Sequence, residues 1–434
     1  MDTKALRQKI LDLAIHGKLV PQDPNDEPAS VLLERIKAEK ERLIKEGKIK
    51  KSKKSAKTSD TPHYEQELPD GWCFSTLGEV FTLQAGKNIT AKDIKDTNTE
   101  FHSYKCYGGN GVRGFVASYN RDGDFPIIGR QGALCGNINI AKGKFYATEH
   151  AVVVERYCDT ELLWAYYTLI ALDLNQYATA TAQPGLSVTV INDVCIQIPP
   201  QKEQKRISKE IERWFALIDQ IEQSKADLQT TIKQTKSKIL DLAIHGKLVP
   251  QDPNDEPAIE LLKRINPDFT PCDNGHYTQL PDGWSVCKLE QIVDYEQPTA
   301  YIVNSTAYDN SYSIPVLTAG KSFIIGYTNE TTGIYSNLPC IIFDDFTTDS
   351  KLVDFPFKVK SSAMKILKVH KDIEIDYVAI FMSITKLVGD THKRYWISEY
   401  SKLEMPIPPK AEQKRIVYAI REAFAQLDTI MESL

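Results

Sequence analysis

The sequence predicts an α+β protein in which two globular inserts of mixed β-strands and helices are separated by two long antiparallel coiled-coil helices. The predicted arrangement is pseudo-two-fold and circular. Three observations in the 434-residue chain predict it: a framework that occurs twice, a heptad pattern that runs through this framework, and two unlike segments with strand-like runs between its copies.

The repeated framework is the first observation. Twenty residues, ILDLAIHGKLVPQDPNDEPA, occupy positions 10–29 and recur unchanged at 239–258. Two shorter repeats are LPDGW, at 68–72 and 280–284, and IPP-x-x-EQKRI, at 198–207 and 407–416. Between LPDGW and IPP the two halves share no comparable identity. One framework therefore carries two different inserts.

The heptad pattern is the second observation. It predicts one long helix from Pro200 to His245, which at ~1.5 Å per residue would be ~69 Å long. Its positions recur by steps of three and four, with Lys225 and Thr235 as the two polar exceptions. The apolar positions are Ile207, Ile211, Trp214, Ile218, Ile221, Leu228, Ile232, Ile239 and Leu242. The pattern continues near both chain ends, so the second long helix is predicted to be split between the termini. The termini would then meet or pair with another chain.

The inserts are the third observation. Each alternates strand-like apolar runs with glycine-rich turns, and each holds one apolar stretch of helical length, ELLWAYYTLIALDL or IDYVAIFMSITKLV. LPDGW opens each insert with a Pro-Asp-Gly turn, and its tryptophan is expected in the core. A compact α+β domain is predicted for each insert.

These signals divide the chain into seven parts. They are an N-terminal helix and repeat (1–36), a basic linker or helix extension (37–62), the first insert (63–200), the central long helix (201–247), a linker (248–275), the second insert (276–409) and a C-terminal helix (410–434). Residues 37–57 hold ten Lys or Arg and three Glu. This basic segment would either contact DNA phosphates or be a solvated linker.

Composition excludes several classes of protein. Apolar residues make up 42% and charged residues 26% of the chain, as in ordinary globular proteins. The longest charge-free apolar stretch, 162–172, is too short to span a bilayer, and the first residues do not form a signal peptide. The eight cysteines form no C-x-x-C pair, which favours buried thiols in a reducing cytosol. A cytoplasmic protein without membrane association is expected.

Catalytic and cofactor motifs are incomplete. Gly320-Lys321-Ser322 lacks the upstream glycine of a phosphate-binding loop, because Pro315 stands there. Asp344-Asp345 has no further metal ligands nearby and is expected on a solvated or DNA-facing loop. His16 and His245 end equivalent helices, where a cation is favourable without any catalytic role. No nucleotide, metal or catalytic site is predicted.

Candidate DNA contacts are polar side chains on or beside the glycine-rich turns, where the backbone can approach a groove closely. Arg and Lys can read guanine edges, and Asn and Gln can read adenine edges. The candidates are Asn110, Arg113, Arg130, Gln131 and Asn137 in the first insert, and Lys321, Thr347, Lys351, Lys393 and Arg394 in the second.

Over essentially its full length, the chain resembles the DNA-specificity subunit of type I restriction–modification systems. The resemblance rests on the duplicated LDLAIHGKLVPQ, the paired LPDGW and IPP-x-x-EQKRI motifs, and the heptad pattern between them. IGRQGALCG at 128–136 and IIFDDFTTDSKLVDFPFKVKSSAMKIL at 341–367 also resemble alternative recognition-domain sequences of that family.

The resemblance implies that each insert is a target-recognition domain that reads one half of a bipartite, asymmetric site in double-stranded DNA. The paired helices would set the gap between the halves and dock two modification subunits, which bind S-adenosylmethionine and methylate adenine. Restriction subunits that use ATP and Mg would join them for cleavage and translocation. The chain itself would hold no cofactor and be noncatalytic. The target bases and the gap length are not predicted.

Two alternatives are kept beside this interpretation. A self-contained DNA-modifying enzyme would bind S-adenosylmethionine as a lone chain. A coiled-coil protein scaffold would bind proteins through its inserts, and Arg130→Ala and Lys351→Ala would then leave any DNA affinity unchanged.

Overall fold

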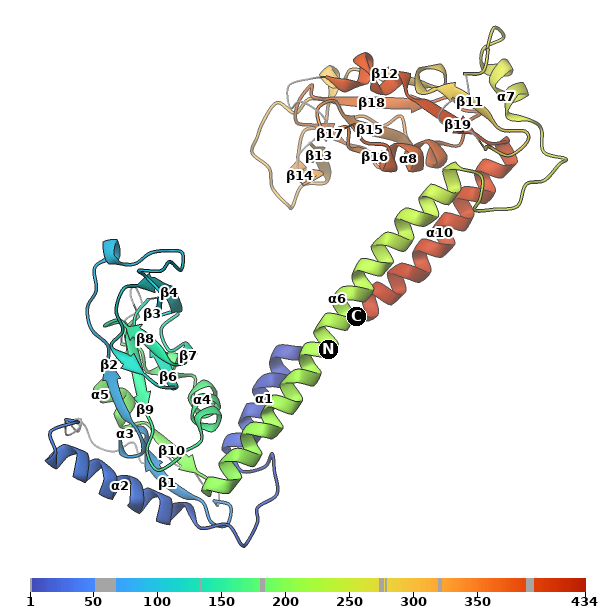
Figure 1. The fold of residues 1–434 in the computed structure, drawn as a ribbon. Helices are drawn as coiled ribbons and strands as arrows, with labels where there is room; N and C mark the ends of the chain where they lie inside the picture. The colour runs from blue at the N-terminus through green and yellow to red at the C-terminus, as the bar shows by residue number, and fades with distance from the viewer. Residues whose placement is uncertain are drawn as a thin grey trace. The chain divides into compact units, whose positions relative to one another are not determined.

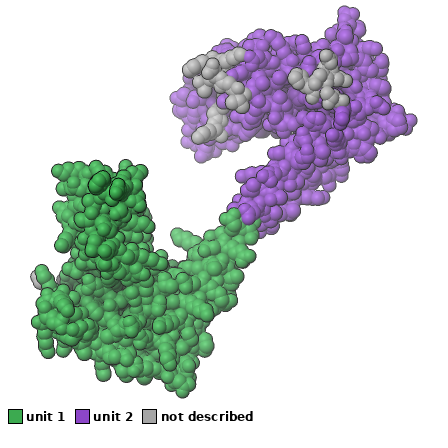
Figure 2. All heavy atoms as spheres, viewed as in Figure 1, with its two compact units in different colours: residues 1–224 green, residues 225–434 purple. Residues whose placement is uncertain are grey.

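The computed structural model describes residues 2–50, 68–132, 134–179, 184–272, 277, 279–318, 322–387 and 394–434. The chain forms two compact units, Met1–Ser224 and Lys225–Leu434 (Figure 2). Helix α6 (Gln201–Ile244) contributes its first part to unit 1 and its remaining part to unit 2. The predicted central helix is confirmed to within one residue at each end.

In unit 1, helix α1 (Thr3–Ile15) lies along the first part of α6 (Figure 1). Asp2 begins α1, because its Oδ1 accepts a hydrogen bond from the N–H of Ala5 at 3.0 Å. Near its start, α1 contacts α6 through an ion pair between Arg7 and Asp219. Near its end it meets Ile207, which is earlier in α6. The two helices are therefore antiparallel.

In unit 2, helix α10 (Lys410–Ser433) lies along the remaining part of α6 and is also antiparallel to it. Asp428 near the end of α10 pairs with Lys236, whereas Glu412 near its beginning bonds to Gln251, just beyond α6. Each unit therefore contains an antiparallel pair of helices, and the two terminal helices that the heptad pattern predicts are present.

The heptad prediction is wrong at two positions of α6. Ile207, Ile211 and the other isoleucines at 218 and 232 are buried as predicted, but Trp214 is 37% exposed and Leu228 is 39% exposed. The neighbouring Phe215 packs instead, with its ring edge-on to Tyr167 at 5.6 Å. A straight helix has 3.6 residues per turn, so a strict seven-residue repeat drifts away from the contact face.

Two segments that were predicted wholly or partly as linkers contain helices. Helix α2 (Ala29–Lys45) enters the basic segment, which is therefore a helix extension as far as Lys45. Residues 51–62 lie outside the described residues. The interval 248–275 was predicted as a linker, but it contains helix α7 (Ala258–Ile265), whose inner face is buried. That prediction is wrong for α7, because the spacing of its apolar residues packs the helix against the hydrophobic core of unit 2.

Each insert is closed at its base by a two-stranded antiparallel ladder. In unit 1, β1 (Cys73–Thr76), directly after LPDGW, pairs with β10 (Cys195–Ile198), directly before the Pro-Pro pair. In unit 2, β11 (Ser285–Lys288) pairs with β19 (Glu404–Ile407) in the same way. The first and last strands of each insert therefore lie side by side, next to the framework.

The first insert contains two further sheets. One has the order β2-β9-β6-β7 and the other has the order β4-β3-β8-β5. The strands are β2 (Thr82–Ala85), β3 (Tyr104–Gly108), β4 (Gly111–Val116), β5 (Arg121–Asp122), β6 (Phe125–Gly129), β7 (Ile138–Ala141), β8 (Lys144–Ala147) and β9 (Ala151–Glu155). The helices are α3 (Leu77–Val80), α4 (Leu162–Ala171) and α5 (Val188–Asn192), with short 3₁₀ turns η1 (Ala91–Asp93) and η2 (Leu174–Tyr177).

The second insert has the sheets β12-β18-β15-β16 and β14-β13-β17. The strands are β12 (Val293–Glu296), β13 (Ile314–Leu317), β14 (Ile324–Thr328), β15 (Cys340–Asp344), β16 (Ser350–Val353), β17 (Lys358–Val359) and β18 (Met364–Val369). The helices are α8 (Ile375–Ile384) and α9 (Tyr395–Ser398), with the 3₁₀ turns η3 (Leu289–Gln291), η4 (Pro298–Tyr301) and η5 (Tyr400–Lys402).

The two inserts share one topology. The order β2-β9-β6-β7 corresponds to β12-β18-β15-β16. In the other sheet β3 pairs antiparallel with β4 and parallel with β8, as β13 does with β14 and β17. Helices α4 and α8 follow β9 and β18. The framework thus carries two domains of the same α+β fold, although their sequences are unlike.

The hydrophobic core joins each insert to its framework. In unit 1 one cluster includes Ile10 of α1, Trp72 of LPDGW, Val152 of β9, Trp164 of α4 and Ile207 of α6. Burial of this continuous apolar surface couples the insert to the helices rather than leaving it on a loose tether. Among the described helices, none is long and apolar enough to cross a membrane.

Candidate nucleic-acid interface

The EQKR motif fixes the first insert to its framework. Glu203 is buried, and its Oε2 accepts from Trp72 Nε1 at 3.1 Å while its Oε1 accepts from Gln22 Nε2 at 3.2 Å. Arg206 donates to Asp26 at 2.7 Å. Gln204 Oε1 accepts from the backbone N–H of Glu161, at the start of α4, at 3.0 Å. One turn of α6 thereby holds the duplicated segment, the opening turn and the insert's helix.

The same contacts recur in unit 2. Glu412 accepts from Trp284 and Gln251, both at 3.1 Å, and Arg415 donates to Asp255 at 2.6 Å. The side chain of Gln413 accepts from the backbone N–H at the start of α8 at 2.8 Å. The repeated residues therefore make repeated contacts, and each insert is held to its framework in the same way.

Burial governs the ionisation of the two glutamates. It raises the pKa of the Glu203 carboxyl above the ordinary value, while the hydrogen bonds from Gln22 and Trp72 oppose the rise. The pKa of Glu412 is raised for the same reason. Because these groups lie between framework and insert, they are part of the scaffold rather than of an exposed site.

The two helix-end histidines also have structural contacts. His16 Nδ1 lies 2.7 Å from the backbone oxygen of Asp12, and His245 Nδ1 lies 2.8 Å from that of Asp241. Each ring therefore bonds to a carbonyl one turn earlier in its own helix, as a helix-ending residue does.

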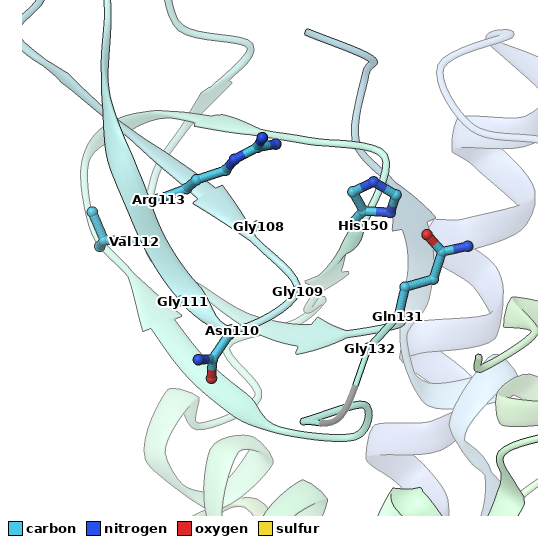
Figure 3. A pocket seen from close by; sticks show the side chains of 9 residues that line it. All are labelled: Gly108, Gly109, Asn110, Gly111, Val112, Arg113, Gln131, Gly132 and His150. Carbon is cyan, nitrogen blue, oxygen red and sulfur yellow. The ribbon is translucent and has the colours of Figure 1, made fainter. Parts of the chain in front are cut away.

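A hollow of about 540 Å³ lies among the turns of the first insert (Figure 3). The turn between β3 and β4, the segment after β6 and the residue before β9 form it. Its lining residues are Gly108, Gly109, Asn110, Gly111, Val112, Arg113, Gln131, Gly132 and His150. The candidates Asn110, Arg113 and Gln131, which are up to 21 positions apart in the sequence, are thus brought to one place.

Close backbone packing explains the glycines of this hollow. A Cβ on Gly129 would lie 1.8 Å from the backbone oxygen of Gly109, and a Cβ on Gly109 would lie 2.8 Å from that of Gln131. Only glycine permits such an approach. The β3–β4 turn can therefore lie directly against the end of β6, which places the backbone of Gln131 beside Gly109.

The other two candidates of the first insert border this hollow without lining it. Asn137 donates to Asn110 Oδ1 at 3.2 Å and so orients that side chain. Arg130 is half-buried, and its Nε has no hydrogen-bond partner among the residues that the structure describes. Its backbone oxygen accepts from Leu186 at 2.9 Å. His150 lines the hollow but was not predicted from the sequence, because no neighbouring glycine or motif marks it and strand pairing alone brings it there.

A second hollow, of about 530 Å³, lies in the second insert. Its lining residues are Thr318, Phe323, Ile342, Asp344, Thr347, Asp349, Ser350, Lys351, Met364, Ser383 and Lys386. The candidates Thr347 and Lys351 are among them, and Lys351 Nζ lies 4.5 Å from the centre of the Phe323 ring. The side chains of Asp349, Ser383 and Lys386 were missed, since their place depends on how α8 packs on the sheet.

The remaining candidates of the second insert do not line this hollow. Arg394 is exposed and lies 6.0 Å from the centre of the Phe346 ring, just before α9. Lys321 and Lys393 lie outside the described residues.

The expectation of a solvated loop at Asp344-Asp345 is wrong, although Asp344 does line the second hollow. Both residues are buried. Asp344 accepts from the N–H of Phe346 at 2.9 Å, and Asp345 accepts from the N–H of Trp396 at 2.8 Å. These carboxylates hold a turn together. Within the described ranges, no group of three or more His, Cys, Asp or Glu is placed to hold a metal ion.

The two hollows lie at corresponding turns of the shared topology, although the second also extends over β16 and the end of α8. Each lies between the turn after β3 or β13 and the turn after β6 or β15, and each reaches the beginning of β9 or β18. Their linings differ: the first presents amide, guanidinium and imidazole groups, and the second presents lysines, hydroxyls and carboxylates. The equivalent sites are therefore suited to different polar partners.

Comparisons with known proteins agree with this organisation. The model of the type I restriction modification DNA specificity domain matches residues 69–230 and 281–433, one match in each half. The type I restriction enzyme EcoEI specificity subunit of Escherichia coli is 29% identical, over 99% of this chain and 90% of the relative. The EcoprrI specificity subunit, also of Escherichia coli, is 43% identical over 146 residues, which span only 34% of this chain and 36% of that relative.

A solved structure shares the fold. It comes from work on complex assembly and conformational transition of the type I R-M system, and it matches with a TM-score of 0.59 at 14% identity. The match covers 85% of this chain and 94% of that chain. At this identity the likeness concerns the fold alone.

Proposed function

The chain belongs to the family of the type I restriction modification DNA specificity domain, and from this premise we propose that it is the DNA-recognition subunit of a type I restriction–modification complex. Each insert reads one half of a bipartite, asymmetric site in double-stranded DNA. The chain itself is noncatalytic and works in the cytoplasm, where it meets cellular DNA.

One observation carries this proposal. The framework contacts and the insert topology are the same in both units, and a hollow lies at corresponding turns of each insert, while the side chains that line it differ. Two equivalent sites of unlike chemistry suit a task done twice on two different sequences. A pure scaffold gives no reason for polar linings to differ while their position is kept.

The lining groups suit contacts to base edges. Arg113 can donate two hydrogen bonds to guanine O6 and N7, and Asn110 or Gln131 can pair with adenine N6 and N7. In the second insert Lys351 can donate to guanine, and Thr347 can contact either kind of base. Both inserts carry more acidic than basic residues, so these local groups rather than bulk charge supply the selectivity.

The partners follow from the same proposal. The paired helices dock two modification subunits, which hold S-adenosylmethionine and methylate an adenine in each half of the site. Restriction subunits, which use ATP and Mg, join this assembly for translocation and cleavage. The helices set the gap between the halves as a coiled-coil ruler in a pseudo-two-fold, circular arrangement, in which the termini either meet or pair with another chain.

An adenine-methylation map tests the proposal. The chain is expressed with its cognate modification subunit in a host without other adenine methylation, and the DNA is sequenced for N6-methyladenine. We expect a two-part motif with a fixed gap that disappears when this chain is omitted. A soluble complex that methylates no defined motif would contradict the proposal. Binding of S-adenosylmethionine by the lone chain would point to a self-contained enzyme instead.

A further inference from the structure

We propose that Asp349 and Lys386 of the second insert together read one C·G base pair in the half-site that this insert recognises. The inference rests on the function proposed above. It goes beyond that function because it assigns one base pair to two side chains that are not among the candidate DNA contacts named from the sequence.

The two side chains meet at the rim of the second hollow. Asp349 lies in the turn between β15 and β16, and Lys386 lies two residues beyond the end of α8. Their Oδ1 and Nζ atoms form an ion pair, and the side chains remain 56% and 54% exposed. A carboxylate and an ammonium group are therefore presented side by side to solvent.

The turn that carries Asp349 is held rigidly. Asp344 is buried, and its Oδ2 accepts from the hydroxyl of Thr347 at 2.8 Å. The backbone N–H of Asp344 donates to the backbone oxygen of Asp349 at 2.8 Å. This closed turn fixes the direction in which Asp349 leaves the sheet.

Lys386 is tied to the same turn. The backbone N–H of its neighbour Leu387 donates to the hydroxyl of the buried Thr348 at 3.2 Å. This bond joins the segment after α8 to the β15–β16 turn. The backbone segments that carry Asp349 and Lys386 are therefore held next to each other, as two side chains that contact one base pair require.

The hollow also holds an unsatisfied polar group. The hydroxyl of Ser350 is buried and has no hydrogen-bond partner among the described residues. Ser350 lines the same hollow as Asp349 and Lys386. A buried hydroxyl without a partner is costly, so this site is suited to a ligand that brings hydrogen-bonding groups.

The chemistry of the pair matches C·G. In the major groove cytosine presents its N4 amine, a donor, beside the O6 and N7 acceptors of guanine. Asp349 can accept from the amine, and Lys386, which has three donors and no acceptor, can bond to the two guanine atoms. An A·T pair also offers one donor, adenine N6, but a single acceptor on each side of it, adenine N7 or thymine O4. The pair therefore favours C·G over A·T through the second guanine acceptor.

The first hollow offers no such combination. Among the described residues that line it, the polar side chains are Asn110, Arg113, Gln131 and His150, and none is a carboxylate. The contact is thus specific to the second insert, and changes in it should leave the other half of the site untouched.

The first test is a methylation map of the complete complex with Asp349→Ala or Lys386→Gln. Lys263→Gln is the matched control, because Lys263 forms an exposed ion pair with Glu260 on α7 and lines neither hollow. We expect each pocket variant to relax one C·G position in one half, with discrimination falling about 5- to 150-fold. The gap, the other half and the control should be unchanged.

A second test uses the base itself. N4-methylcytosine at the relaxed position places a methyl group where Asp349 would accept the amine proton. It should weaken binding by the wild-type complex but not by the Asp349→Ala complex. Lys386→Gln should leave the salt dependence of binding unchanged, whereas loss of a phosphate contact lowers the slope by about 1.

The outcomes separate this inference from the proposed function. A wild-type complex that yields no two-part motif contradicts both. A clear motif that the two pocket variants leave intact, or a half-site without a C·G pair, overturns this inference alone. Uniform weakening across all sequences with a reduced salt slope would make Lys386 a phosphate contact and would also overturn it.

Discussion

The indole nitrogen of Trp72 donates a 3.1 Å hydrogen bond to the buried carboxyl of Glu203, and Trp284 makes the same bond to Glu412. Trp72 follows the opening turn of the insert, and Glu203 lies in the first turn of the helix that leaves it. The bond therefore ties the beginning of an insert to its end. An insert fixed at this one place can change its sequence elsewhere without changing how it is held.

Loss of this bond should destabilise each unit. Trp72→Phe or Trp284→Phe removes the donor and leaves a buried carboxyl oxygen unsatisfied, which we expect to lower the free energy of unfolding by about 1–3 kcal/mol. Urea unfolding followed by far-UV circular dichroism measures it. Trp214→Phe is the control, because that tryptophan is exposed on α6. Equal effects for all three variants would contradict a special role for the bond.

The buried carboxyl should give stability a recognisable pH dependence. The pKa of Glu203 is raised in the folded protein above its ordinary value of 4.5, mainly by burial. The folded protein then holds the proton more tightly than the unfolded chain. Stability therefore falls as the pH rises from the ordinary pKa of the carboxyl to its raised pKa in the folded protein. On acidification from neutral pH, the wild type should gain stability relative to Glu203→Gln.

Unfolding of both proteins at a series of pH values measures this difference, in which the other carboxyls cancel. Glu412→Gln should behave in the same way for unit 2, since the pKa of Glu412 is raised by the same cause. A wild type that loses stability relative to the variant on acidification would show that the folded state favours the carboxylate.

Substitution of Gly17 by alanine should destabilise the protein far more than the same substitution at another glycine of similar backbone conformation. Gly17 has φ +66°, and a Cβ there would lie 2.4 Å from Pro69 Cγ. Gly47 has φ +70°, but a Cβ there would meet nothing within 4 Å. Gly47→Ala should therefore cost only the left-handed strain, about 1–2 kcal/mol, and Gly17→Ala clearly more. Thermal unfolding compares them, and similar losses would show that the contact with LPDGW is unimportant.

Arg113 should act on one half of the DNA site. If its guanidinium contacts a guanine, Arg113→Ala should lower discrimination at one position by about 1–3 kcal/mol and leave the other half unaffected. Methylation rates on duplexes with single substitutions measure this. Lys105→Ala is a suitable control, because that exposed residue of β3 does not line the hollow. An equal loss at every position would indicate a phosphate contact instead.

The framework was predictable because its signals are local. The duplicated twenty residues, the glycine after each helix-ending histidine and the heptad steps all act within a few turns of chain. Bounds of α6 and the presence of both terminal helices followed from them. Trp214 shows the limit of this approach, since a periodic pattern does not fix which of two adjacent aromatic residues faces the partner helix.

The sites were predictable only in part because they are assembled by long-range strand pairing. Asn110, Gln131 and Lys351 stood out through neighbouring glycines or motif likeness, but their common topological position is not visible in unlike sequences. His150 and Lys386 enter the hollows only when β9 and α8 pack against the sheets. Asp344 shows the converse, because a conspicuous acidic residue is buried and holds a turn together while it lines the second hollow.

The central claim is that each insert is held to its framework in the same way and independently reads one half of the DNA site. The most direct measurement replaces residues 285–407 by residues 73–198, joined at the paired strands β1 and β10 in place of β11 and β19. The methylation map of this chain should show the half read by the first insert twice, with the other half lost. A map that keeps the original second half, or that changes both halves, would contradict the account.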